Sequence, residues 1–72
     1  MINLTERQAK IMQYIRAFKK RAGVAPTYRE IAAYMGITVN GVKKHLELIE
    51  KKGQIEVTPY KARGIEIKED KK

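Results

Sequence analysis

The fold is decided by residues 26–53, which read PTYREIAAYMGITVNGVKKHLELIEKKG. Thr27 and Glu30 have the spacing of a capping box, in which a hydroxyl and a carboxylate satisfy the free amides at the start of a helix. The short helix that follows can end at Gly36, because glycine adopts a left-handed backbone without a steric penalty. This stretch therefore predicts a compact helix between the capping box and Gly36.

A longer helix begins only two residues later. Thr38 is a typical N-cap, and the apolar residues after it recur at helical spacing, which predicts a helix over about residues 39–52. Its inward stripe is Val42, Leu46 and Ile49. Two helices joined by so short a turn are typical of a helix-turn-helix.

Upstream of this unit, Thr5 and Gln8 form a second capping box. An apolar stripe at helical spacing follows, which predicts a first helix over about residues 5–22 with a stop at Gly23. The stripe consists of Ile11, Ile15, Phe18 and Ala22.

Downstream, the apolar period changes from 3.6 to 2. Ile55 and Val57 alternate with a glutamate, and so do Ile65 and Ile67, which predicts two half-buried strands joined by residues 59–63. The predicted fold class is α+β, a winged helix-turn-helix with a three-helix bundle followed by a two-stranded β-hairpin wing. We expect one domain over residues 1–68 and a charged tail over 69–72.

The charge balance indicates a nucleic-acid partner. Sixteen Lys and Arg residues oppose eight Asp and Glu residues, which gives a formal net charge of +8 on 72 residues. The chain has no Cys, so disulfides and thiolate metal sites are excluded and a reducing cytoplasm is the expected compartment. Charged residues throughout the first 20 positions exclude a signal peptide or a membrane span there.

The predicted third helix and wing supply the candidate DNA contacts. A helix fits the major groove, where an Asn can pair with adenine and a Lys with guanine, and helix N-termini attract phosphates. The recognition-helix candidates are Thr38, Val39, Asn40, Lys43 and Lys44. The phosphate candidates at a helix N-terminus are Thr27, Tyr28 and Arg29, and the wing candidates are Lys61 and Arg63.

The sequence gives little support for metal binding or catalysis. His45 is the only His and is expected to pack rather than to bind a metal. Without Ser or Cys the chain lacks the usual nucleophiles, and its glutamates are spread over caps and exposed faces. We therefore expect no enzyme activity, no cofactor, no metal, no membrane partner and no small-molecule substrate.

Several fragments, taken in order, resemble the N-terminal DNA-binding domain of the LexA repressor family. They are Leu4-Thr5-x-Arg7-Gln8, Pro26-Thr27-x-Arg29-Glu30-Ile31-Ala32, Gly36, His45-Leu46, Lys52-Gly53-x-Ile55 and Arg63-Gly64-Ile65. The resemblance covers about residues 2–67. It implies a repressor domain that reads its operator with the third helix, which carries over to Val39, Asn40, Lys43 and Lys44.

The chain departs from the family pattern in two ways. LexA-like repressors usually carry one more residue between the turn glycine and the His-Leu pair, so the start of the recognition helix is reshaped and a LexA-type operator is not assumed. They also continue into a self-cleaving domain with a Ser/Lys dyad, whereas this chain has no Ser. We expect either an excised domain or a free-standing relative of phage or plasmid type.

Three functions stay open at this point. Sequence-specific binding of double-stranded DNA, with two copies as a dimer on a palindromic operator, is favoured. The alternatives are a winged-helix protein-interaction module, such as an antirepressor or an adaptor of another regulator, and non-specific binding of nucleic acid, including RNA. The residues do not distinguish repression from activation, and repression follows from the resemblance alone.

Overall fold

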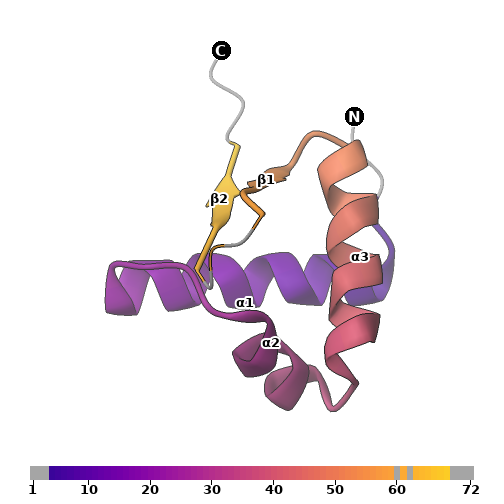
Figure 1. The fold of residues 1–72 in the computed structure, drawn as a ribbon, viewed down its shortest axis with the longest axis horizontal. Helices are drawn as coiled ribbons and strands as arrows, with labels where there is room; N and C mark the ends of the chain where they lie inside the picture. The colour runs from indigo at the N-terminus through magenta and orange to yellow at the C-terminus, as the bar shows by residue number, and fades with distance from the viewer. Residues whose placement is uncertain (1–3, 60, 62, 69–72) are drawn as a thin grey trace.

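The computed structural model describes residues 4–59, 61 and 63–68. Three helices precede a two-stranded hairpin: α1 (Glu6–Ala22), α2 (Tyr28–Met35), α3 (Val39–Lys51), β1 (Ile55–Val57) and β2 (Ile65–Ile67). Figure 1 shows α3 crossing the N-terminal part of α1, with α2 on one side of α1 and the wing on the other. The predicted winged helix-turn-helix is confirmed, and each predicted helix boundary lies within one residue of the observed one.

Short-range caps fix the starts of the helices. The Thr5 N–H donates to Gln8 Oε1 at 3.1 Å and the Gln8 N–H donates to Thr5 Oγ1 at 3.2 Å. Thr27 and Glu30 make the same reciprocal pair at 2.8 and 3.1 Å. Each cap is worth about 1 kcal/mol, and its partners are three residues apart, so these helix starts are specified locally.

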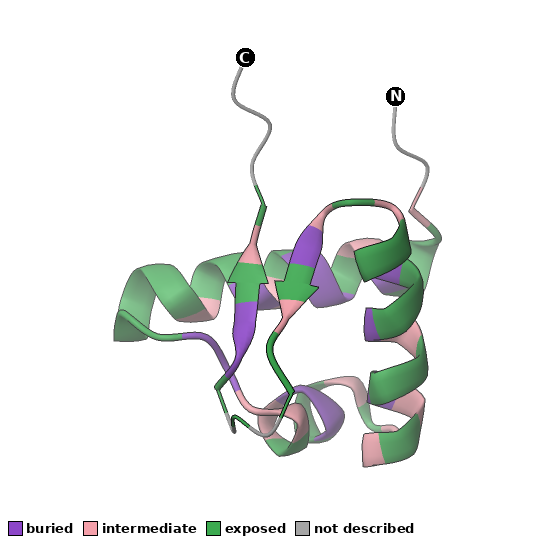
Figure 2. Cartoon of the chain, turned by 45° about the horizontal axis from the view of Figure 1, so that its top comes forward, coloured by how far each residue is buried: buried purple, intermediate pink, exposed green. Residues whose placement is uncertain are grey.

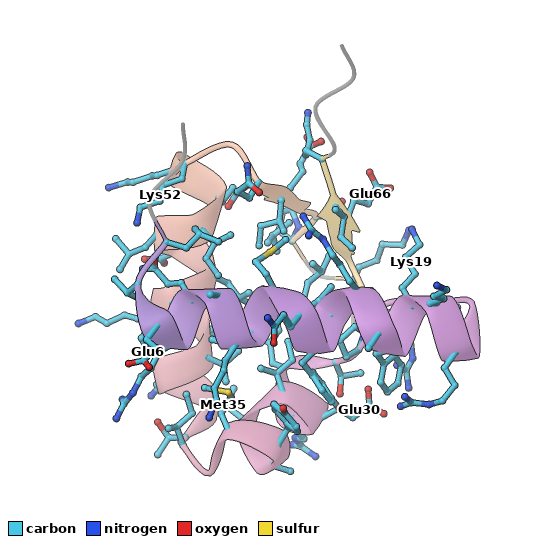
Figure 3. The ribbon with its side chains drawn as sticks, turned by 180° about the vertical axis from the view of Figure 1, so that it is seen from behind. Glu6, Lys19, Glu30, Met35, Lys52 and Glu66 are labelled. Carbon is cyan, nitrogen blue, oxygen red and sulfur yellow. The ribbon has the colours of Figure 1, made fainter. Side chains whose placement is uncertain are left out.

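The core lies where the three helices and the wing meet, as the buried faces in Figure 2 show. It contains Ile11, Met12, Ile15, Ala25, Ile31, Ala32, Val42, Leu46, Ile49, Ile55 and Ile65. The buried Gln8 side chain accepts a hydrogen bond from Lys52 Nζ at 2.9 Å, so it also joins the start of α1 to the end of α3. Figure 3 labels Lys52 at this junction.

The stripe predicted along α1 is buried only in its first half. Ile11 and Ile15 are fully buried, but Phe18 is half-buried and Ala22 is exposed. Figure 1 shows that the C-terminal end of α1, where Ala22 lies, extends past α2 and α3, so neither helix covers it. The Phe18 ring lies 5.8 Å from that of Tyr14 and has the Arg63 guanidinium of the wing 5.8 Å from its centre.

The wing is an antiparallel pair in which Ile55 lies opposite Ile67, Glu56 opposite Glu66 and Val57 opposite Ile65. Beyond the pair, the Thr58 N–H donates to the Gly64 carbonyl at 2.9 Å. A Cβ at Gly64 would lie 2.6 Å from the Thr58 carbonyl oxygen, so the hairpin requires glycine there. Residues 60 and 62 of the predicted turn and the predicted tail 69–72 lie outside the described residues.

Candidate nucleic-acid interface

Helix α3 has two faces of opposite character. Val42, Leu46 and Ile49 are buried against the rest of the bundle. Asn40 and Lys44, four residues apart, share the opposite face and are exposed. The buried stripe therefore turns the predicted residues Asn40 and Lys44 to solvent, together with Glu47 and Leu48, which were not among the predicted site residues.

The N-terminus of α3 is held by Thr38, whose Oγ1 accepts a hydrogen bond from the Gly41 N–H at 3.0 Å. Thr38 and Lys43 are exposed, and Val39 is half-buried. The hydroxyl of Thr38 can still donate, because a hydroxyl that accepts one hydrogen bond keeps its own hydrogen. The five predicted residues of this helix thus lie on its first two turns and reach solvent to different degrees.

A groove of about 920 Å³ runs between α3 and the wing, with the first turn of α2 at its side. It brings together residues from three segments of the chain: Thr27, Tyr28 and Arg29 from the start of α2; Val39, Lys43, Leu46, Glu47 and Glu50 from α3; and Val57, Thr58, Pro59 and Lys61 from the wing. The structure therefore places the residues predicted to bind phosphate and Lys61 around one groove with part of α3.

Tyr28 is the most perturbed group of this groove. Partial burial raises the pKa of Tyr28 above 10.0, and the nearby charges of Glu50 and Glu47 raise it further. A phenol of ordinary pKa is already protonated at neutral pH, and the raised pKa keeps Tyr28 a hydrogen-bond donor to higher pH.

Glu50 also connects two elements, because its Oε2 accepts a hydrogen bond from the Val57 N–H at 3.2 Å. Helix α3 and β1 are joined at this point. Neither Glu47 nor Glu50 was among the predicted site residues. Nothing in their sequence spacing signals the groove, since it exists only once the wing folds back beside α3.

Arg63 does not accompany Lys61. Its guanidinium turns towards α2, where Nη1 lies 3.0 Å from Glu30 Oε1 and Nη2 lies 3.2 Å from Glu30 Oε2. Nη1 also donates to the Ala25 carbonyl at 2.9 Å. The Arg63 side chain therefore binds a carboxylate and a carbonyl of the same chain, while the predicted DNA contact of Lys61 and Arg63 stays a prediction.

These contacts change the titration of Glu30. The hydrogen bonds from Arg63, followed by that from the Thr27 N–H, lower the pKa of Glu30 below its ordinary value. Glu30 is therefore held in its charged form, which is the form that can accept from both partners.

With the geometry established, comparison with known proteins identifies the family. The family model described as the LexA DNA binding domain matches residues 1–64. The chain belongs to the LexA DNA-binding domain family. The resemblance noted from the sequence motifs is thereby confirmed, and so is the winged-helix fold that it implied.

Curated relatives of this LexA-type domain are named LexA repressor. The chain is 43% identical over 67 residues to that of Leptospira biflexa, which covers 93% of this chain and 33% of the relative. It is 37% identical over 70 residues to that of Cellvibrio japonicus, covering 96% and 35%, and 44% identical over 66 residues to that of Sorangium cellulosum, covering 90% and 29%. The chain spans about one third of the length of the curated relatives that it matches.

The described part of the LexA-type domain shows neither a metal-binding cluster nor a membrane-spanning helix. Within residues 4–59, 61 and 63–68, no three His, Asp or Glu side chains are grouped so that they could hold a metal ion. Over the same residues no helix is long and apolar enough to cross a bilayer. His45 lies on α3 with a buried Nδ1 that has no hydrogen-bond partner among the described groups.

Proposed function

We propose that this chain binds double-stranded DNA sequence-specifically and is the DNA-reading domain of a transcriptional repressor. The observation that carries the proposal is the two-faced α3, whose buried stripe presents Asn40 and Lys44 to solvent beside an open groove. A helix exposed in this way has the dimensions to enter the major groove, where each base pair has its own pattern of donors and acceptors. The formal net charge of +8 supplies the attraction to phosphate that such binding needs.

The first two turns of α3 carry the groups that read bases. The Asn40 amide can pair bidentately with the N6 and N7 edge of adenine, and the methyl groups of Val39 can contact a thymine methyl. Lys43 and Lys44 can reach guanine acceptors or phosphates.

The groove residues supply backbone contacts. Tyr28 as a neutral phenol, Arg29 as a cation and Thr27 as a hydroxyl lie at the start of α2, where the helix dipole favours an anion. Lys61 lines the same groove from the wing. Together they can hold the sugar-phosphate strand that borders the major groove entered by α3.

One such domain covers a short half-site, so useful affinity requires two copies on a palindromic operator. Repression is taken from the relatives, which are named LexA repressor. The bacterial cytoplasm, where operator DNA of chromosomal, phage or plasmid type lies, is the compartment that this function requires.

A selection from random duplex DNA, read by sequencing at about 150 mM salt, tests the proposal. We expect an enriched motif with two related half-sites for the unaltered chain and none for the Lys43→Glu, Lys44→Glu variant. The charge-matched control reverses Lys19 and Lys20, which are exposed in the last turn of α1, and should keep the motif. Equal, weak binding to all sequences by the unaltered chain would contradict the proposal.

A further inference from the structure

Arg63 is held by groups from three parts of the chain that precede the wing. Glu30 belongs to the first turn of α2, Ala25 to the linker before it, and Phe18 to α1. The guanidinium makes a two-point contact with the carboxylate, donates to the Ala25 carbonyl and lies 5.8 Å from the centre of the Phe18 ring. Figure 3 labels Glu30 where α2 begins, close to the C-terminal half of α1.

The contact depends on features that only an arginine has. Two parallel N–H groups match the two oxygens of a carboxylate, and the flat guanidinium can stack on an aromatic ring. A lysine at the same position offers a single point charge and cannot make the two-point contact and the carbonyl contact in this geometry.

The Glu30 carboxylate also belongs to the capping box of α2, the first helix of the helix-turn-helix. Glu30 Oε1 accepts from the Thr27 N–H at 2.8 Å as well as from Arg63 Nη1 at 3.0 Å. The strand that returns from the wing is therefore connected to the group that caps α2. At the other strand, Glu50 connects Val57 to α3.

This arrangement bears on Lys61, which lies two residues before Arg63 and lines the same groove as Lys43. A Cβ at Gly64 would lie 2.6 Å from the Thr58 carbonyl oxygen and 3.0 Å from Lys61 Cβ, so Lys61 packs closely against the residue that follows Arg63. Anchoring Arg63 to α2 therefore also bears on where Lys61 lies.

We propose that Arg63 is a positioning residue, which anchors the wing to the start of α2 through Glu30 and so places Lys61 for a DNA phosphate, and that it does not itself contact DNA. This inference rests on the proposed function. The inference goes beyond the proposed function because it assigns different roles to the two basic residues of the wing. Lys61 contacts a phosphate, whereas Arg63 anchors the wing.

The decisive variant is Glu30→Gln, because glutamine preserves the capping box while removing the ion pair. If Arg63 is an anchor, this variant should bind duplex DNA about three- to tenfold more weakly than the control Glu66→Gln, which removes one negative charge from the exposed face of the wing. If Arg63 contacted phosphate, Glu30→Gln would free it, and binding would stay equal or become tighter.

Two further variants complete the test. Arg63→Lys should be as weak as Glu30→Gln, whereas a phosphate contact would be largely retained by lysine. Lys61→Ala alone should weaken DNA binding and lower its salt dependence by about one counterion. When it is combined with Glu30→Gln, it should weaken binding little further. Far-UV circular dichroism and urea unfolding establish that each variant is folded at the assay temperature.

The outcomes separate this inference from the function on which it rests. Weaker binding by both Glu30→Gln and Arg63→Lys, together with non-additivity with Lys61→Ala, supports the anchor. Tight binding by Glu30→Gln or Arg63→Lys, or full additivity, overturns it while leaving DNA binding intact. Failure of the unaltered chain to prefer any duplex sequence contradicts the proposed function instead.

Discussion

Glu30 accepts hydrogen bonds from two directions, and its titration should be visible in the stability of the whole domain. Arg63 and the Thr27 N–H lower its pKa in the folded state, so the folded chain binds a proton at this position less readily than the unfolded chain. The contribution of Glu30 to stability is therefore complete above the ordinary value of 4.5 and is lost as the pH falls through the lower folded-state value.

Urea unfolding of the unaltered chain and Glu30→Gln between pH 7 and about pH 2 measures this contribution. We expect the unaltered chain to be more stable at pH 7 and the difference to disappear at the acid end. Glu66→Gln reports the effect of losing one negative charge on the wing. A difference that stayed constant with pH would show that the contacts of Glu30 do not form in solution.

Replacement of two glycines by alanine should change the stability of the fold in opposite directions. Gly64→Ala would bring a methyl group 2.6 Å from the Thr58 carbonyl oxygen and should destabilise the fold by about 1–3 kcal/mol. A Cβ at Gly41, in the first turn of α3, meets nothing closer than 3.4 Å, so Gly41→Ala should stabilise the fold by roughly 0.5–1 kcal/mol. Thermal unfolding of both variants measures this, and equal effects of the same sign would contradict the account.

Residue-scale features were predictable from the sequence where the partners are close along the chain. The capping boxes of Thr5 and Thr27 join residues three positions apart, and both were predicted correctly. Arg63 and Glu30 are 33 positions apart, and only the packing of the wing against α2 brings them together. The sequence showed that both residues are charged but not that they bind each other.

One face of α3 stabilises the fold, and the opposite face carries the proposed function. Leu46 is 1% exposed and Leu48 is 45% exposed on the same helix. Leu46→Ala should cost about 2–5 kcal/mol, which is comparable with the roughly 3–5 kcal/mol expected for a domain of this size. We expect that variant to be largely unfolded at 37 °C by far-UV circular dichroism.

Leu48→Ala is the matched control, because the same atoms are removed from the solvent face. Its unfolding free energy should stay within about 0.5 kcal/mol of the unaltered chain. Similar losses for the two leucines would contradict the assignment of the buried face of α3.

Helical periodicity predicted the elements better than it predicted their burial. The boundaries of α1 follow from Thr5 and Gly23, which act within the helix itself. Whether Phe18 and Ala22 are covered depends on the lengths of other helices, and α2 and α3 do not reach them. An apolar stripe thus indicates which face of a helix turns inward, while its buried length is set by the neighbouring elements.

For the whole molecule, charge indicated the class of partner but not the surface that meets it. Lys43 and Lys61 line the groove together with Glu47 and Glu50. The outward face of the wing carries Glu56 opposite Glu66, with Lys68 Nζ 3.5 Å from Glu56. Acidic and basic residues therefore lie together in the groove and on the wing, and this mixture could be seen only after the wing was placed beside α3.

The measurement that tests the central claim most directly is the base preference of the Asn40→Ala variant at each position of its binding site, compared with that of the unaltered chain. If α3 reads the major groove, Asn40→Ala should relax one base pair in each half-site at a cost of about 1–3 kcal/mol, and Lys61→Ala should weaken binding with the preferences unchanged. An Asn40→Ala motif identical to that of the unaltered chain would show that another surface reads the DNA.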